Sequence, residues 1–358
     1  MYSGPETKVI TMRSQVPAPG LGPAAAGEPI AVTAARHGID RRALLRWSAG
    51  MAGTLALPVV PFAERIAQAL ATVPRLPVLW LNGQDCNGDS EGLLRSSSPT
   101  PSQLILDQLS LDYTELLMAP SGAAAEARIA EIMARYPGGY VVVVEGSVPT
   151  AAGGTFCCVS GRSFADLVRQ VAAGALAVIA VGSCAADGGL PRAAGGVTGA
   201  VSVPTLLAGT GKKIITLPGC PMNVDNLTAT LVQYLTLGTW PETDTSGRPL
   251  FAYGARIHQG CPRLPFFRAG QYVRAWGDAG HQAGWCLRYV GCQGQQTYAN
   301  CATKKFNGAT SFPIQAGAPC LGCARSTFWS GLSSSFTWTP PAATLSPATA
   351  DALLTATA

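Results

Sequence analysis

The sequence is short of charge and has no basic run. Only 13% of its 358 residues are Asp, Glu, Lys or Arg, 47% are hydrophobic, and the formal net charge is +5. Without a Lys/Arg cluster or a recognition helix, nucleic acid is not expected as a partner. The length allows two domains, and a surface this poor in charge is typical of a chain that another subunit covers.

The chain also lacks a hydrophobic run long enough to span a membrane, in the Ser/Thr/Pro/Ala-rich tail 331–358 as elsewhere. In the N-terminal extension, residues 1–75, Arg41 and Arg42 precede an apolar stretch and so resemble a twin-arginine export signal. Two prolines interrupt that stretch, and the arginines lie unusually deep in the chain. We therefore interpret the segment as a retained remnant and expect a cytoplasmic protein that could associate with a membrane. A working signal would instead place the protein in the periplasm.

Between residues 76 and 250, short apolar runs alternate with stretches of helical periodicity. We expect strands at 77–81, 140–146, 176–184 and 212–220, and helices at 102–111, 163–175 and 224–237. Repeated strand-then-helix units predict an α/β fold, in which an open, doubly wound parallel sheet has helices on both faces.

Cysteine is the most informative residue type. The chain has 11 cysteines, an odd number in a long chain, which argues against a disulfide framework, although buried thiols and some disulfides are the plainest interpretation. Six of the cysteines and two of the three histidines, His258 and His281, fall between His258 and Cys323. Few helices or strands are predicted after residue 250, so metal ligation would supply the cross-links that a small apolar core cannot.

Three further cysteines each follow an expected strand: Cys86, Cys184 and Cys220. The carboxyl ends of parallel strands meet at one edge of a sheet, so the three loops should bring these thiols together. Asp89 lies three residues after Cys86, where a C-x-x-C loop would carry its second cysteine. The four residues predict a metal site with one oxygen donor.

Zinc is the first alternative for the cysteines after residue 250. "HQGC" (258–261), "CLRYVGC" (286–292) and "CLGC" (320–323) could each supply a zinc pair. Cys301 stands alone between them, however, and seven ligands divide poorly into tetrahedral fours. Four ligands plus three fit one [4Fe–4S] and one [3Fe–4S] cluster better.

Taken together, the motifs resemble those of the small, electron-transferring subunit of [NiFe]-hydrogenases over roughly residues 75–330. The matching stretches are "LWLNGQDCNGDSE", "VVEGSVPT", "VGSCAADGG", "LPGCPMN", "GRPLFAYGARIHQGCPR", "GWCLRYVGCQG" and "FPIQAGAPCLGC". The resemblance implies a flavodoxin-like domain (76–250) followed by an irregular iron–sulfur domain (251–330). It also implies H2 oxidation at a NiFe centre in a large partner subunit, from which this chain passes electrons to an acceptor that the sequence does not identify. Higher oligomers of the heterodimer are expected.

The resemblance also implies three ligand sets, two for [4Fe–4S] clusters and one for a [3Fe–4S] cluster. The proximal [4Fe–4S] set is Cys86, Asp89, Cys184 and Cys220; the distal [4Fe–4S] set is His258, Cys261, Cys286 and Cys292; the medial [3Fe–4S] set is Cys301, Cys320 and Cys323. Pro313 stands where a fourth medial thiolate would complete a cubane.

Asp89 is the departure from the family pattern, because the usual loop is C-x-G-C. An aspartate here resembles the actinobacterial-type, high-affinity branch associated with oxygen tolerance. The two extra proximal cysteines of oxygen-tolerant membrane-bound relatives are absent, and Gly88 and Gly189 occupy their positions. Cys157 and Cys158 are interpreted as ordinary thiols; alternatively, one of them replaces Asp89 as the fourth proximal ligand.

Two glutamates close to the proximal set, Glu91 and Glu145, are interpreted as structural residues that cap or pair, with proton movement as the alternative. Three other functions were weighed against the hydrogenase subunit. A hydrogen-sensing regulatory hydrogenase should lack the export-like segment. The cluster-bearing subunit of respiratory complex I lacks the Cys/His set after residue 250. A zinc-stabilised scaffold would contain zinc and no labile sulfide.

Overall fold

The computed structural model describes residues 41–55, 57–59, 61–64, 66, 75–96, 109–193 and 196–329. The tail 331–358, residues 1–40 and most of the helix expected at 102–111 lie outside these ranges. Within the part of the chain that is described, no helix is both long and apolar enough to cross a membrane.

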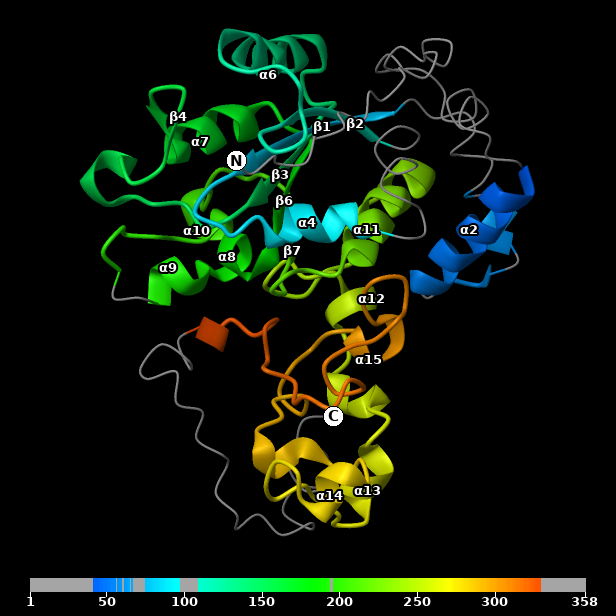
Figure 1. Ribbon diagram of the computed structural model, residues 1–358. Coiled ribbons are helices and arrows are strands. Elements are labelled where there is room, and N and C mark those ends of the chain that lie inside the picture. Colours follow the sequence, from blue (N-terminus) through cyan, green and yellow to red (C-terminus); the bar gives the residue numbers. More distant parts are fainter. Residues whose placement is uncertain are drawn as a thin grey trace, which may run out of the picture.

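A five-stranded parallel sheet forms the centre of the molecule (Figure 1). Its strands are β1 (Leu76–Asn82), β2 (Leu109–Thr114), β3 (Val141–Glu145), β6 (Ala177–Val181) and β7 (Ile214–Leu217). The spatial order is β2-β1-β3-β6-β7, which is the flavodoxin-like arrangement of a doubly wound sheet. The predicted fold class is therefore confirmed.

Both faces of the sheet are buried, and successive residues of each strand pack into different cores. Val142 and Val144 of β3 join the cluster formed with α6 (Ala123–Arg135) and α7 (Phe164–Ala173). Val141 and Val143 face the opposite cluster, which contains α11 (Val224–Leu237). Burial on both sides explains why the strands read as continuous Val/Ile/Ala runs.

The ends of α11 follow from local chemistry. Asn223 caps its first turn by accepting a hydrogen bond from the backbone N–H of Asp225. Gly238, at φ +69°, ends the helix in the left-handed conformation that glycine adopts without strain. The expected helix at 224–237 is confirmed at both ends.

One expectation was wrong. Residues 109–111, placed in a helix by their leucine spacing, belong to β2, an edge strand of the sheet. Its burial pattern shows two half-exposed residues in the middle, as expected where one side of a strand faces solvent. Helix α6 was not anticipated, although its apolar residues Ala125, Ile129 and Ile132 recur at helical spacing.

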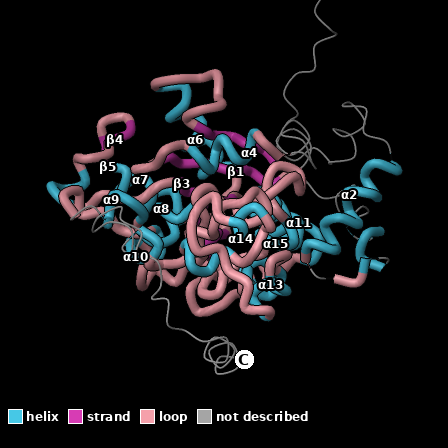
Figure 2. The backbone as a smooth tube through the Cα atoms, turned by 60° about the horizontal axis from the view of Figure 1, so that its bottom comes forward, coloured by secondary structure: helices cyan, strands magenta, loops and turns pink. Residues whose placement is uncertain are grey.

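Residues 251–329, here called the C-terminal segment, are built differently. Their helices are only four or five residues long: η3 (Ile257–Gly260), α13 (Leu264–Arg268), α14 (Ala279–Gln282), η4 (Leu287–Val290) and α15 (Cys301–Lys304). The rest is loop, as Figure 2 shows in pink around α14 and α15. Ile257, Leu287 and Ile314 nevertheless pack into the same apolar cluster as α11. The segment is therefore attached to the sheet region by a continuous core.

Helix α2 (Arg41–Thr54) contains the twin-arginine pair and packs beside α11. Its residues Met51 and Ala52 are buried in the cluster shared with α11. Thr54 Oγ1 accepts a hydrogen bond of 2.7 Å from Nζ of Lys304 in α15. Helix α2 therefore contacts both the sheet region and the C-terminal segment.

Candidate metal centre

The first ligand group lies at the carboxyl edge of the sheet, as the strand-end positions predicted. Cys86 is in the loop after β1, Cys184 is in α8 (Gly182–Asp187) directly after β6, and Cys220 is in the loop after β7. Asp89 is in α4 (Gly88–Leu94). Asp89 and Cys86 are charge neighbours of Cys184, and Cys184, Cys86 and Asp89 are charge neighbours of Cys220. The structure thus brings the four residues together.

Two of these thiols, those of Cys184 and Cys220, resist ionisation. Burial raises the pKa of Cys184 to about 11 and that of Cys220 to about 12, and the neighbouring thiols and Asp89 add to both increases. Thiolates crowded in this way need a compensating positive charge, which iron would supply. The group is therefore suited to binding a cationic centre, because without one the negative charges of free thiolates would repel one another.

Asp89 is held in one orientation inside this group. Its side chain is 8% exposed, and its Oδ1 accepts a hydrogen bond of 2.6 Å from the backbone N–H of Met222. Burial, followed by the charge of Glu145, raises the pKa of Asp89 to about 8.

Gly182 makes room for that carboxylate. A Cβ at this position would lie 1.9 Å from Oδ2 of Asp89, and the residue has φ +76°. Any side chain at 182 would therefore displace Asp89. Sequence reasoning missed this residue, since the contact joins loops 93 positions apart in the chain.

Glu145, at the end of β3, accepts hydrogen bonds from several groups at the same edge of the sheet. It is fully buried, and its carboxylate accepts hydrogen bonds from the indole N–H of Trp80 (3.1 Å) and from the backbone N–H groups of Asp89 (2.9 Å) and Ser90 (3.0 Å). The N–H groups of Asp89 and Ser90 lie in the first turn of α4, where they have no acceptor within the helix. Glu145, on strand β3, therefore caps this helix. Its predicted capping role is confirmed. Glu91, by contrast, is exposed and pairs with Arg95 on the same helix.

Gly189 is the position at which oxygen-tolerant membrane-bound relatives are expected to have an extra cysteine. It has φ +57°, and a Cβ built there would lie 2.3 Å from Sγ of Cys184. In this backbone conformation no side chain fits at position 189. The tight contact explains physically why the additional thiol is absent.

The second ligand group lies in the C-terminal segment and consists of His258, Cys261, Cys286 and Cys292. Cys286 is buried, and its pKa is raised to about 12 by burial and then by nearby Cys292 and Cys261. His258, on η3, is 6% exposed, and its imidazole packs edge-to-face on Phe267 with ring centroids 4.6 Å apart. Its carbonyl oxygen accepts a hydrogen bond from the N–H of Cys261 at 3.2 Å. The backbone of η3 therefore connects His258 to Cys261, and Phe267 packs against the imidazole.

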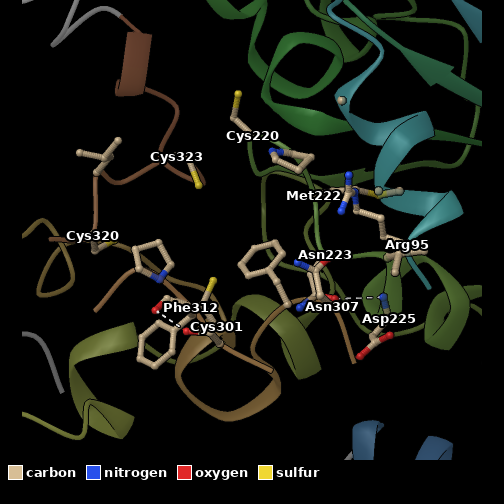
Figure 3. Close-up of a pocket in the computed structure, with 18 of the residues that line it drawn as sticks. Arg95, Cys220, Met222, Asn223, Asp225, Cys301, Asn307, Phe312, Cys320 and Cys323 are labelled. Carbon is tan, nitrogen blue, oxygen red and sulfur yellow. Dashed lines mark hydrogen bonds between the residues drawn. The ribbon is translucent and has the colours of Figure 1, made fainter. Parts of the chain in front are cut away.

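The third group surrounds a cavity of about 640 Å³. Cys301, Cys320 and Cys323 line it together with Cys220 of the first group (Figure 3). Pro313, the position expected to lack a fourth thiolate, lines the same cavity. Burial raises the pKa of Cys301 to about 12, with Cys323 and Cys320 as its nearest charges.

The three groups follow one another in space. Cys323 and Cys220 line the same cavity, and the backbone N–H of Gln293, next to Cys292, donates a hydrogen bond of 2.7 Å to the carbonyl oxygen of Cys320. The third group therefore lies between the first and the second. The hydroxyl of Ser183, next to Cys184, also donates a hydrogen bond to the carbonyl oxygen of Cys323.

The donor chemistry fits iron–sulfur clusters. All 11 cysteines are free thiols. In the described ranges, no three His, Cys, Asp or Glu side chains converge closely enough to hold a single metal ion. A cluster needs a wider spacing, because each ligand binds a different iron.

Cys157 and Cys158 lie apart from these groups. They precede and begin a small hairpin of β4 (Cys158–Val159) and β5 (Arg162–Ser163). Cys157 is half-buried against the α6/α7 core, and Cys158 is exposed. Burial, and then Glu115, raises the pKa of Cys157 to about 11. The geometry favours their interpretation as ordinary thiols.

Two protein-family models match the two regions of the chain. Residues 253–336 match the C-terminal model of the NiFe/NiFeSe hydrogenase small subunit. Residues 86–234 match the model of the 20 kDa subunit of NADH ubiquinone oxidoreductase. The respiratory-complex resemblance is thus limited to the sheet region, as expected from the sequence.

Similar proteins cover most of the chain. The uptake hydrogenase small subunit of Azotobacter vinelandii is 45% identical over 294 residues, which are 82% of this chain and 81% of that protein. The hydrogenase-2 small chain of Escherichia coli K12 is 42% identical over 288 residues, 80% of this chain and 77% of that one.

Solved structures agree with these sequence matches. A Ni-Fe-Se hydrogenase of Desulfomicrobium baculatum superposes with a TM-score of 0.69 at 33% identity, covering 75% of this chain and all of that one. The actinobacterial-type NiFe-hydrogenase of Ralstonia eutropha H16 has the same fold, with a TM-score of 0.67 at 24% identity over 76% of this chain and 84% of that one. The chain belongs to the family of NiFe/NiFeSe hydrogenase small subunits, which are parts of oxidoreductase complexes that act on hydrogen.

Proposed function

We propose that this chain is the electron-transferring small subunit of an H2-oxidising uptake [NiFe]-hydrogenase. Three iron–sulfur clusters would carry single electrons from a NiFe centre in a large subunit to an external acceptor. The observation that supports this proposal most strongly is the spatial order of the ligand groups. The sheet-edge group and the His258 group are joined by the cysteines around the central cavity.

Each group would hold one cluster. Cys86, Asp89, Cys184 and Cys220 would bind the proximal [4Fe–4S] cluster; His258, Cys261, Cys286 and Cys292 the distal [4Fe–4S] cluster; and Cys301, Cys320 and Cys323 the medial [3Fe–4S] cluster. Residues 76–250 and 251–330 would be the two cluster-binding parts. The chain's own contribution is to set the spacing between ligands, their hydrogen bonds and their distance from water.

The large subunit would cover the sheet edge that carries the first group. Cys86 and Cys220 are exposed there in the isolated chain, whereas a cluster ligand in such a complex needs protection from solvent. Higher oligomers of the heterodimer belong to the same proposal.

We also assign the chain to the actinobacterial-type, oxygen-tolerant branch, with Asp89 as an iron ligand. Asp89 is buried among the three thiols, and Gly182 leaves space for its carboxylate. A carboxylate is a harder donor than a thiolate, so it should alter the potential of the cluster. Mössbauer and EPR spectra of Asp89→Cys and Asp89→Ala should both differ from those of the wild-type complex. Identical spectra in all three proteins would refute ligation by Asp89.

The proposal places the protein in the cytoplasm, with α2 retained. Met51 and Ala52 of α2 are buried in the shared core, and Thr54 accepts a hydrogen bond from Lys304. Intact-mass measurement of the chain from the purified complex should find residues 41–66 still present. A mature chain that begins after residue 66 would favour export instead.

Metal analysis tests the function as a whole. The complex purified through this chain should contain about eleven iron atoms per small subunit, matching labile sulfide and nickel in the large subunit. It should also reduce methylene blue with H2. Zinc in place of iron and sulfide would support the scaffold alternative.

A further inference from the structure

Charge is distributed very unevenly between the two regions of the chain. Residues 76–250 have 14 acidic and nine basic side chains, whereas residues 251–329 have eight Lys and Arg side chains and one acidic side chain, Asp278. Figure 1 places α13 and α14 at the opposite end of the molecule from the sheet. Residues 76–250 therefore have a net negative charge, whereas residues 251–329 have a net positive charge.

The positive charge at that end is available to a partner. Arg268, at the end of α13, and Arg274 are exposed. Among the described residues, neither forms an ion pair with a carboxylate. Asp278 accepts hydrogen bonds from the backbone N–H groups of Arg274, Ala275 and His281, so its carboxylate caps α14.

Packed aromatic rings connect this surface to the second ligand group. His258 contacts Phe267 (4.6 Å between ring centroids), Phe267 contacts Tyr272 (6.0 Å), and Tyr272 contacts Tyr289 (4.7 Å). The guanidinium carbon of Arg274 lies 4.2 Å from the centroid of Tyr289. Three aromatic rings, Tyr289, Tyr272 and Phe267, therefore lie between Arg274 and His258.

We propose that the surface formed by Arg268, Arg274 and Trp276, here called the basic surface, docks an acidic redox protein that accepts the electrons. This inference rests on the proposed function. It adds the chemistry of the acceptor: a protein with a negative patch around its redox centre, guided by the field of the C-terminal segment.

A membrane surface fits these observations less well. Within the described part of residues 261–300, Trp276, at 58% exposure, is the single large hydrophobic side chain on the surface. Insertion at a lipid interface needs a row of such side chains on one helix face, and α13 and α14 have only five and four residues. One exposed aromatic side chain in a segment with exposed arginines is typical of a protein interface.

The test measures H2-dependent reduction of two haem proteins by the purified complex: the acidic soluble domain of cytochrome b5 and basic cytochrome c. The variant is Arg268→Glu with Arg274→Glu. The control is Arg135→Glu with Arg169→Glu, an equal charge change at exposed positions on α6 and α7. At low ionic strength, the first variant should lower the second-order rate for cytochrome b5 by about tenfold or more. The control should stay within about twofold.

Three further readouts make the outcome decisive. Added salt should slow the wild-type reaction with cytochrome b5, because screening weakens the attraction. Methylene blue reduction should be equal in all variants, showing that they fold and carry electrons. If cytochrome b5 rates are the same in both variants, or if the arginines instead govern binding to phosphatidylserine vesicles, the inference is wrong. If no version reduces methylene blue with H2, the proposed function itself fails.

Discussion

The sheet region and the C-terminal segment hold their backbones by different means. All five residues of β3 are fully buried between two helical layers, and the neighbouring strands pair with it along their length. In the C-terminal segment, some residues join the core shared with α11, and the separate apolar cluster is small, with Phe267, Tyr272 and Cys286 as its buried members. Hydrophobic burial accounts for the first structure, and the proposed iron–sulfur ligation would add cross-links to the second.

Removing iron should separate the two regions most clearly. When a chelator strips the complex, amide hydrogen exchange in residues 251–329 should rise by orders of magnitude, because ligation supplies cross-links there that burial does not. Strands β1, β3 and β6 should keep their protection. Equal loss of protection in both regions would show that the sheet also depends on metal.

A substitution in the core of the sheet should lower stability and leave the iron content unchanged. Leu79 is fully buried in β1, so Leu79→Ala should lower the free energy of unfolding by about 2–5 kcal/mol while iron content stays unchanged. Leu116→Ala is the matched control, since Leu116 is 46% exposed and should change stability by less than about 0.5 kcal/mol. Denaturant titration measures both. Similar values for the two variants would contradict the assigned core.

The two glutamates near the first ligand group, Glu145 and Glu91, should differ in how much they stabilise the fold. Glu145→Gln removes the charge that caps α4 and should cost about 1.5–3 kcal/mol. Glu91→Gln breaks an exposed pair with Arg95 and should cost at most about 0.5 kcal/mol. Thermal unfolding of the two variants under identical conditions distinguishes them. A larger cost for Glu91→Gln would show that the exposed glutamate has a structural role.

Asp89 gives the metal-free chain a pH dependence. Its pKa in the folded protein is raised from 3.8 to about 8, so between these values the folded state binds a proton that the unfolded state has released. Stability from this group is therefore present at low pH and is lost as pH rises towards 8, with a slope of at most about 1.4 kcal/mol per pH unit. Asp89→Asn should remove this contribution. An unchanged slope in that variant would show that Asp89 is not the responsible group.

Much of this arrangement follows from the sequence. Strand-end loops predicted that Cys86, Cys184 and Cys220 would meet, because the carboxyl ends of parallel strands share one edge. The buried strands were recognisable as short β-branched runs, and α11 by its helical periodicity. For the C-terminal segment, the number and spacing of cysteines replaced periodicity as the useful signal.

The remainder depends on contacts that no local pattern contains. β2 was mistaken for a helix because leucine spacing outweighed its short alternation, and the neighbour that makes it a strand, β1, is far away in sequence. The fit of Gly182 against Asp89 and the chain of rings from His258 to Tyr289 also required three-dimensional positions. The same holds for the charge difference between the two ends, because only the fold places Arg268 and Arg274 far from the sheet.

The hydrogen bond between Lys304 and Thr54 has a consequence for biosynthesis. The two residues are 250 positions apart, so α2 leaves the ribosome long before the helix that donates to it. During synthesis, the apolar residues of α2 have no core to pack against until α11 has been made. The hydrogen bond from Lys304 can form only after α15 has been made. This N-terminal stretch is therefore more accessible to other factors during synthesis than in the folded protein.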